Sequence, residues 1–253
     1  MKIDPAKFAA IGFAAALVLA WQLLAELRLL SPIFFPSPAR AVAVLIDRVR
    51  DQSIWLPIGA TGLRMLLGWA LASLFGVVIG AAIGSSRLAR DLLEPTLEFV
   101  RPLPASAVIP VAILFLGLSN AMSLAVIAFG AIWPVLLASV HGFSSVQPEL
   151  RQVSDVLGFK RDAFVWKIAL PSALPDIIAG LRVSLAISLI LAVVTEMQAS
   201  LPGLGWDIFY AQRVYRSADL YAGLIVLGAL GFMGNLLLMQ IERRALRWRA
   251  ANG

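Results

Sequence analysis

Side chains with catalytic potential are sparse in this sequence, and they do not form a recognisable set. The 253-residue chain has no cysteine and a single histidine, His141, which excludes thiolate chemistry and metal sites built from cysteines or clustered histidines. Its four lysines, Lys2, Lys7, Lys160 and Lys167, all lie outside any GxxxxGK[ST] phosphate-binding loop. We therefore predict no catalytic residue, no metal site and no cofactor bound by this chain.

Two ionisable residues, Arg182 and Glu196, lie within a largely apolar run near residues 177–199. Such a group is a functional candidate by default, although Glu196 could equally be a structural carboxylate bonded to backbone or water. Arg182 can extend its guanidinium to the interface and anchor the helix, and Asn235 suits a hydrogen bond between helices. We take Glu196, Met197, Arg182 and Asn235 as candidate residues of a translocation pathway.

Membrane helices must position these residues, because apolar sequence dominates the whole chain. Of its residues 60% are hydrophobic and 14% are charged, and the apolar excess is spread too evenly to form one buried core. The formal net charge of +6 does not indicate nucleic-acid binding, since the cations gather at the ends of apolar runs, as in polytopic membrane proteins. We therefore predict an integral protein of the lipid membrane with no nucleic-acid partner.

Six apolar runs can serve as spans, since a crossing takes about 20 helical residues. The runs are Phe8–Ala25, Met65–Gly84, two parts of Pro102–Val140 separated at Gly117–Asn120, a run near Ile177–Ala199, and Leu220–Gln240. No small-x-small cleavage site follows the first run, so we interpret it as a retained span and not as a signal peptide. The prediction is an all-α bundle of six spans, with residues 1–253 forming a single transmembrane domain.

Lysine and arginine positions orient this bundle. With a cytoplasmic N-terminus, more than twice as many of these cations fall inside as outside, leaving aside Arg64 and Arg182 in or beside spans. That asymmetry predicts cytoplasmic N- and C-termini and a cytoplasmic loop at about residues 145–175. On the outer side, Ala39–Arg50 has helical spacing that suits either a helix at the membrane surface or a solvated loop helix.

Small residues recur every four positions in the second span, at Gly68, Ala72, Gly76, Gly80 and Gly84. This stripe predicts that another helix approaches closely. Static packing is a simpler interpretation than sliding during gating.

A charged, helix-breaking segment at residues 149–182 is the most informative part of the chain. Pro148 and Glu149 suit the first turn of a helix, and Gly158 suits its C-terminal cap. A second short helix is predicted to end at Leu170-Pro171. The resulting helix-turn-helix elbow, with apolar residues near its tip, either docks a soluble partner or caps the bundle.

The same segment resembles the signature cytoplasmic loop of ABC importer permeases, the inner-membrane components of binding-protein-dependent transport. The resemblance rests on Leu157-Gly158, Phe164, Leu170-Pro171, Pro175 and Gly180-Leu181-Arg182. Further features are similar to the nitrate, sulfonate and taurine branch and extend over nearly the whole chain: Pro36–Pro38, Glu94-Pro95, RPLP at Arg101–Pro104, Pro110, Glu196-Met197 and Gly203–Gly205.

One departure concerns the Glu-Ala-Ala that names the loop, which reads Gln152-Val153-Ser154 here. The resemblance implies that the loop forms coupling helices, between spans four and five, that dock on an ATPase subunit. The implied coupling residues are Glu149, Gln152, Val153, Ser154, Leu157, Gly158, Phe159, Lys160, Phe164, Leu170 and Pro171.

The resemblance also implies partners. This chain would be the permease subunit of an ATP-driven importer in the bacterial inner (plasma) membrane. It would line the pathway together with a second permease copy, either as a homodimer or paired with a sister permease. A dimer of ABC ATPase subunits would bind ATP and Mg, and a periplasmic or lipoprotein substrate-binding protein would deliver substrate. The chain itself is expected not to be an enzyme.

The branch implies a small anion such as nitrate, a sulfonate or a taurine-like compound, although substrate identity lies beyond this sequence. The alternative is a secondary transporter driven by an ion gradient. Such a transporter would usually show intramembrane carboxylates or broken helices in paired repeats, and only Glu196 is available. A membrane enzyme is disfavoured because no convergent catalytic set exists.

Overall fold

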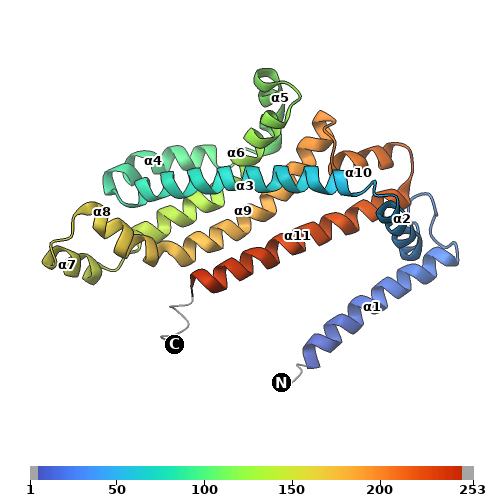
Figure 1. Cartoon of the computed structure of the whole chain (residues 1–253), viewed down its shortest axis with the longest axis horizontal. Helices are drawn as coiled ribbons and strands as arrows, with labels where there is room; N and C mark the ends of the chain where they lie inside the picture. Colours follow the sequence, from blue (N-terminus) through green and yellow to red (C-terminus); the bar gives the residue numbers. More distant parts are fainter. Residues whose placement is uncertain (1–4, 247–253) are drawn as a thin grey trace.

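The structure, a computed structural model, describes residues 5–246, and every regular element in this part of the chain is a helix (Figure 1). Three cations used for the orientation, Lys2, Arg247 and Arg249, lie outside it. The helices are α1 (Pro5–Glu26), α2 (Pro38–Arg50), α3 (Trp55–Gly84), α4 (Arg87–Val100), α5 (Ala105–Leu116), α6 (Asn120–Ser144), α7 (Pro148–Val156), α8 (Arg161–Phe164), the π-helical turn η1 (Val165–Ala169), α9 (Leu170–Ala199), α10 (Leu204–Arg213) and α11 (Ser217–Ala245).

Serine side chains cap the N-termini of several of these helices. Ser37 Oγ accepts a hydrogen bond from the Arg40 amide at 3.3 Å at the start of α2, and Ser119 Oγ accepts one from the Met122 amide at 3.2 Å at the start of α6. Each bond satisfies an amide that the first helical turn leaves without a partner. The predicted break between the third and fourth spans is confirmed, since Gly117 ends α5 with φ at +66°.

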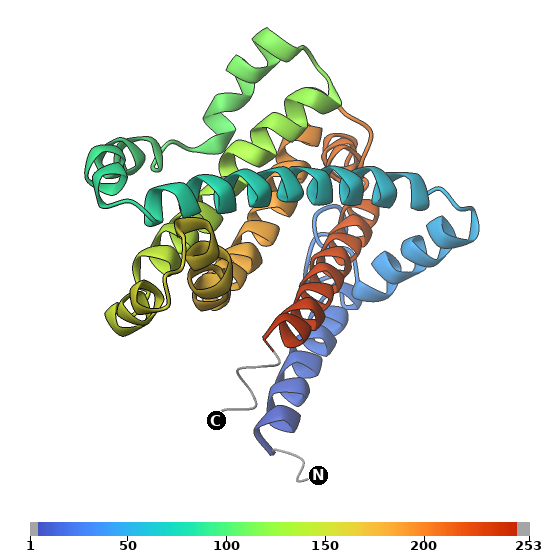
Figure 2. The same ribbon diagram turned by 60° about the vertical axis from the view of Figure 1, so that its left-hand side comes forward.

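Helices α3, α6 and α9 form the centre of the molecule, and α11 lies beside them (Figures 1 and 2). The α7–α8 elbow lies at one end of this bundle, here called the elbow end, and α10 lies at the other, the α10 end. Helix α1 diverges from the centre. Near its own C-terminus α1 contacts α11, where the Trp21 and Tyr221 rings are 5.2 Å apart. The Gln22 side chain also accepts a hydrogen bond from the Ala39 amide of α2 at 3.0 Å.

The glycine stripe of α3 packs against α6, as the sequence predicts. A Cβ atom added at Gly80 would lie 2.5 Å from the Ser139 Cβ and 2.7 Å from the Leu136 carbonyl oxygen, and one added at Gly84 would lie 2.7 Å from the Val140 carbonyl oxygen. The two backbones can approach this closely only because the stripe lacks side chains.

Four helices are long and apolar enough to cross a membrane: α3, α6, the continuous Val165–Ala199 helix and α11. Helices α4 and α5 count as a fifth crossing only as a pair bent by 90°. The described apolar part of α1, Gly12–Glu26, is a shorter apolar helix. The described residues therefore support four or five spans, and the sixth remains a prediction.

The prediction that Leu170-Pro171 ends a helix is wrong. The chain continues through η1 into α9, and this uninterrupted helix spans 35 residues from Val165 to Ala199. Pro171 is the second residue of α9 and has no amide to continue the hydrogen bonding of this helix. The Leu170 amide bonds to the carbonyl of Val165, five residues back, so a widened turn absorbs the proline without breaking the helix.

We expect Gly80→Ala to destabilise the protein by about 1–3 kcal/mol, because its methyl group would overlap α6. The matched control is Gly59→Ala on the same helix, where nothing lies within 4 Å of an added Cβ and the gain in helix propensity stabilises by up to about 1 kcal/mol. Thermal unfolding of the detergent-purified variants, followed by tryptophan fluorescence, measures both effects. Equal melting temperatures for the two variants would contradict the tight α3–α6 contact.

Candidate functional site

A sharp turn at Gly158 forms the tip of the elbow. Gly158 has φ at +65°, a left-handed conformation that glycine adopts without penalty. The Phe159 amide donates to the Ser154 carbonyl at 3.0 Å, and the Leu157 amide donates to the Val153 carbonyl at 3.0 Å. These bonds close the last turn of α7 in the manner of a helix C-cap. The turn predicted at Gly158 is confirmed.

Large apolar side chains are exposed at this tip. Val156 is 87% exposed, Leu157 60% and Val153 51%, and Trp166 of η1, further from the turn, is 71% exposed. The sequence analysis missed Val156 and Trp166. A signal for Val156 is its spacing, since it follows Val153 by three positions and so shares its helix face.

The base of the elbow is fixed to the bundle. Ser154 is buried, and Lys167 Nζ lies 5.2 Å from the centre of the Phe159 ring, within cation–π range. Phe164 packs against a buried cluster contributed by α6, η1, α9 and the preceding loop: Phe143, Val146, Ala169, Ala173 and Ile177. The base of the elbow is therefore packed against both α6 and α9.

The predicted coupling residues fall into two groups in the structure. Those that face solvent are Glu149, Gln152, Val153, Leu157, Gly158 and Lys160. Those that are buried or partly buried are Ser154, Phe159, Phe164, Leu170 and Pro171. Of the three positions where the signature has Glu-Ala-Ala, the first two are thus available for contact and the third faces inward.

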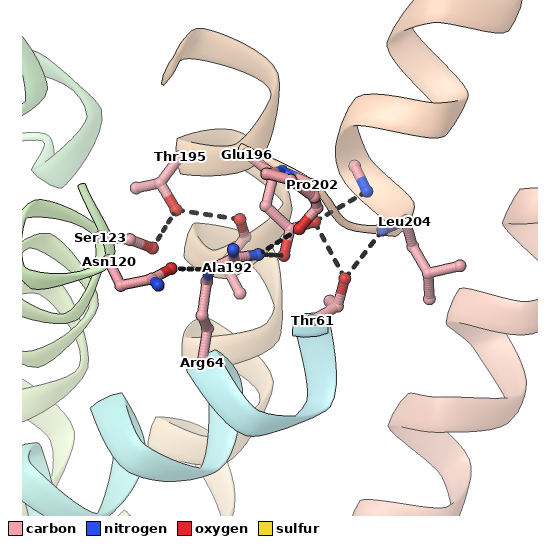
Figure 3. A network of polar contacts seen from close by, with 10 residues as sticks. Thr61, Arg64, Asn120, Ser123, Ala192, Thr195, Glu196, Pro202 and Leu204 are labelled. Carbon is pink, nitrogen blue, oxygen red and sulfur yellow. Dashed lines mark hydrogen bonds and ion pairs between the residues drawn. The ribbon is translucent and has the colours of Figure 1, made fainter. Parts of the chain in front are cut away.

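A polar network lies near the α10 end, around Glu196 of α9 (Figure 3). This carboxylate is fully buried. One oxygen accepts a hydrogen bond from Arg64 Nη1 at 2.8 Å, and the other accepts from Thr61 Oγ1 and the Gly205 amide, each at 2.9 Å. Both of its oxygens accept hydrogen bonds and one of them faces a counter-charge, as a charge buried in a membrane bundle requires.

Arg64 of α3 joins this carboxylate to two more elements. The residue is 8% exposed. Its guanidinium donates to the Pro202 carbonyl at 2.7 Å and to the Asn120 side chain at 2.9 Å. Thr61, one turn earlier, accepts a hydrogen bond from the Leu204 amide at 2.9 Å. The network thus ties α3, α6, α9 and the loop before α10 together (Figure 3).

The Gly203–Gly205 pair is explained by this network. A Cβ atom at Gly203 would collide with the Glu196 carboxylate, and one at Gly205 would lie 2.5 Å from the Val193 carbonyl oxygen. Glycine at both positions lets the loop close over the carboxylate and present the Gly205 amide to it. The sequence analysis left Arg64, Thr61 and Asn120 without a role. The signal for Arg64 was a guanidinium in or beside a spanning helix, which needs a partner.

The four pathway candidates are not brought together in the structure. Glu196 belongs to the buried network, and Met197 beside it is partly buried. Arg182 forms an ion pair with Glu242 of α11, and the Asn235 amide lies 3.8 Å from Met239 Sδ within α11. Their role in a pathway stays a prediction.

A charged rim surrounds the α10 end outside the spans. Arg48 of α2 pairs with Asp207 of α10 at 2.5 Å, and Arg216 pairs with Asp219 at 2.8 Å. The backbone N–H of Ser53 donates to the Asp51 carboxylate and holds its pKa below the ordinary value. Among the described residues, no group of three or more His, Cys, Asp or Glu side chains could hold a metal ion.

Residues 72–247 match the family described as "Binding-protein-dependent transport system inner membrane component". The chain is 30% identical over 243 residues to the taurine transport system permease protein TauC of Escherichia coli (strain K12), covering 94% of this chain and 88% of TauC. It is 30% identical over 235 residues to the putative aliphatic sulfonates transport permease protein SsuC of Bacillus subtilis (strain 168), covering 93% and 85%.

The nitrate import permease protein NrtB of Synechocystis sp. (strain ATCC 27184 / PCC 6803 / Kazusa) is 30% identical over 183 residues, which cover 72% of this chain and 66% of NrtB. Among solved structures, a chain of the MetNI methionine ABC transporter in an inward-facing conformation superposes with a TM-score of 0.66 at 18% identity. The superposition covers 76% of this chain and 96% of the MetNI chain. At this identity the likeness concerns the fold.

We expect Arg64→Ala to destabilise the protein by about 3–5 kcal/mol, because it leaves a buried carboxylate without its counter-charge. The matched control is Arg182→Ala, which breaks the more exposed pair with Glu242 and should cost at most about 1 kcal/mol. Thermal unfolding in lipid nanodiscs measures both. Similar losses in the two variants would show that the Arg64–Glu196 pair is not a central tie.

Proposed function

Because the chain belongs to the family of binding-protein-dependent transport system inner membrane components and is a membrane permease of an ABC importer, we propose that its α7–α8 elbow is the coupling surface. A separate ATPase subunit docks on this elbow and drives the permease. The observation that carries the proposal is a tip with exposed apolar side chains on a base fixed by packing.

An apolar tip beyond the ends of the spans supports docking over capping. Val153, Val156 and Leu157 are exposed and belong to none of the buried clusters of the bundle. Exposed apolar clusters of this kind mark interaction sites, since water solvates them poorly. Lys160 and Glu149 beside them are exposed as well and can form a polar rim around an apolar contact.

The continuous helix from Val165 to Ala199 supports a lever mechanism. Its 35 residues correspond to a length of about 50 Å, enough to connect the elbow with the opposite end of the bundle. At that far end Glu196 is tied to Arg64 of α3. A push on the elbow therefore tilts α9 about a fixed point, and the tilt changes the spacing between α9 and its neighbours.

The partners follow from this division of labour. We propose that two permease copies line the pathway, that two ABC ATPase subunits bind ATP and Mg, and that a periplasmic or lipoprotein substrate-binding protein docks at the α10 end. The elbow end then faces the cytoplasm with both termini, and the α10 end faces outward. This orientation in the bacterial inner membrane agrees with the lysine and arginine distribution of the sequence.

The substrate class is a small anion. The relatives are named for taurine, aliphatic sulfonates and nitrate, and another, the bicarbonate transport system permease protein CmpB of Synechococcus elongatus (strain ATCC 33912 / PCC 7942 / FACHB-805), for bicarbonate. All four names point to compounds with an anionic oxygen-bearing group.

Replacing Gly158 with valine should uncouple transport. The space around Gly158 is open, but its φ of +65° costs a β-branched residue about 1–3 kcal/mol and so reshapes the tip. We expect ATP-dependent uptake and substrate-stimulated ATPase activity of the reconstituted complex to fall at least tenfold.

The control for this experiment is Gly158→Asn, because asparagine tolerates the left-handed conformation and should retain most of the coupling. Membrane abundance of both variants is checked by immunoblotting. Normal uptake by abundant Gly158→Val protein would refute the coupling role of the elbow.

The orientation can be tested with single cysteines, because the chain has none of its own. A membrane-impermeant maleimide added to intact spheroplasts should label Ser53→Cys and leave Gln152→Cys unlabelled. Inverted vesicles should give the reverse result. Labelling of Gln152→Cys in intact spheroplasts would place the elbow outside, where no cytoplasmic ATPase could reach it.

A further inference from the structure

The RPLP motif at residues 101–104 forms a break in a span that the coupling mechanism does not use. Arg101 is the C-cap of α4, and α5 begins after Pro104. The two helices meet at 90°. Pro102 and Pro104 account for the break, since neither can supply a helical amide. A broken helix inside a transporter bundle often contributes to a binding site.

This break lies at the depth of the spans but on the surface of the bundle, since residues 101–104 are exposed. A Cβ atom added at Gly130, near the middle of α6, would lie 2.7 Å from the Ala105 Cβ at the start of α5, and would collide with Leu191 of α9. In Figure 1, α4 runs back beside the elbow-end half of α3 before the chain turns into α5. The Arg101 guanidinium is thus carried by backbone at the depth of the spans and not by a loop beyond them.

A groove of about 520 Å³ opens beside the break, between α5, α6 and α9. Its walls are mainly apolar, and they include Leu103 of the break, Trp133 and Leu137 of α6, and Ile187 and Ile190 of α9. Arg101 also lines it and is the only charged residue that does so among the described residues. A volume of this size accommodates a small organic or inorganic ion.

Arg101 forms no ion pair with any described carboxylate. This distinguishes it from Arg64 and Arg182, which both do. A guanidinium in an apolar groove raises the local concentration of anions, because low-dielectric walls focus its field. Its fork of N–H donors also matches the oxygens of a carboxylate or an oxyanion.

The start of a helix also borders this groove. Helix α5 begins at Ala105, which lines the groove, without a side-chain cap. Its first amides and its dipole therefore add positive potential there. The groove offers donors and positive charge, and no described carboxylate lines it.

We propose that Arg101 is a specificity-determining residue that recognises anions in the translocation pathway. The ligand is a small anion with a carboxylate, sulfonate or inorganic oxyanion group. The inference rests on the proposed function, because the groove is a pathway only in a permease. It differs from the sequence-based candidates in placing recognition at the α4–α5 break and not at Glu196.

Charge-selective thiol modification tests the inference without transport. Ile190 lines the groove and is 60% exposed, so Ile190→Cys in the otherwise cysteine-free full-length chain is the reporter. Membrane vesicles carrying the chain and its co-expressed partners are treated with an anionic reagent, sulfonatoethyl methanethiosulfonate, or a cationic one, trimethylammonioethyl methanethiosulfonate. The ratio of the two reaction rates reports the local potential.

Removing the charge with Arg101→Gln should lower the anion-to-cation rate ratio by about tenfold, as expected for a unit charge within about 10 Å in a partly desolvated groove. Arg101→Lys should retain most of the ratio. The matched control is Arg87→Gln at the exposed start of α4, which removes the same charge away from the groove and should leave the ratio unchanged.

Three results would overturn the inference: an unchanged ratio in Arg101→Gln, an equal fall in Arg87→Gln, or no reaction of Ile190→Cys with either reagent. The last would mean that the groove has no aqueous access. ATP-dependent uptake of taurine and nitrate is measured on the same vesicles. Failure of the wild-type chain in that assay counts against the proposed function, while the rate ratio judges Arg101 independently.

Discussion

A charge inside a membrane bundle must be neutralised and hydrogen-bonded, and the Glu196 carboxylate meets this requirement through its ion pair with Arg64 and the bonds from Thr61 and the Gly205 amide. The pair fixes α9 to α3 at the α10 end, and the loop of Gly203 closes over the carboxylate because glycine leaves room for it. Arg64 extends the tie to α6 through Asn120. Whatever moves at the elbow end, this end of the three central helices is held as one unit.

Motion at the other end has a continuous path to follow. The elbow exposes its apolar tip but packs its base, through Phe164, against α6 and α9. From there one helix runs to Ala199, because a widened turn at Val165–Ala169 accommodates Pro171 without a break. The α3–α6 contact beside it is too close for any side chain at Gly80. This continuous helix and its closely packed neighbours support the proposed coupling role, since packed interfaces transmit displacement instead of absorbing it.

The break between α4 and α5 contrasts with this continuity. It interrupts backbone hydrogen bonding at membrane depth, which is tolerated only where the backbone is buried in protein or lines a cavity. Here it borders the groove that Arg101 enters. Two arginines therefore have different surroundings: Arg64 at the α10 end has a buried carboxylate partner, whereas Arg101 lines an open groove near the middle of α6 and has no described carboxylate partner. The first ties three helices together, and the second is the residue that we propose to bind an anion.

The sequence by itself determined features that are encoded locally: the helical membrane class, the break at Gly117, the elbow with its turn at Gly158, and the small-residue stripe of α3. Helical periodicity, turn chemistry and apolar length act over a few residues and can be read along the chain. Only the tertiary structure decided that Arg64 pairs with Glu196, 132 positions away, that the chain continues through Pro171, and that Arg101 lies at a groove between three helices. These outcomes depend on which helix faces meet in the packed bundle, and pairings between distant residues leave no periodic signal in a single sequence.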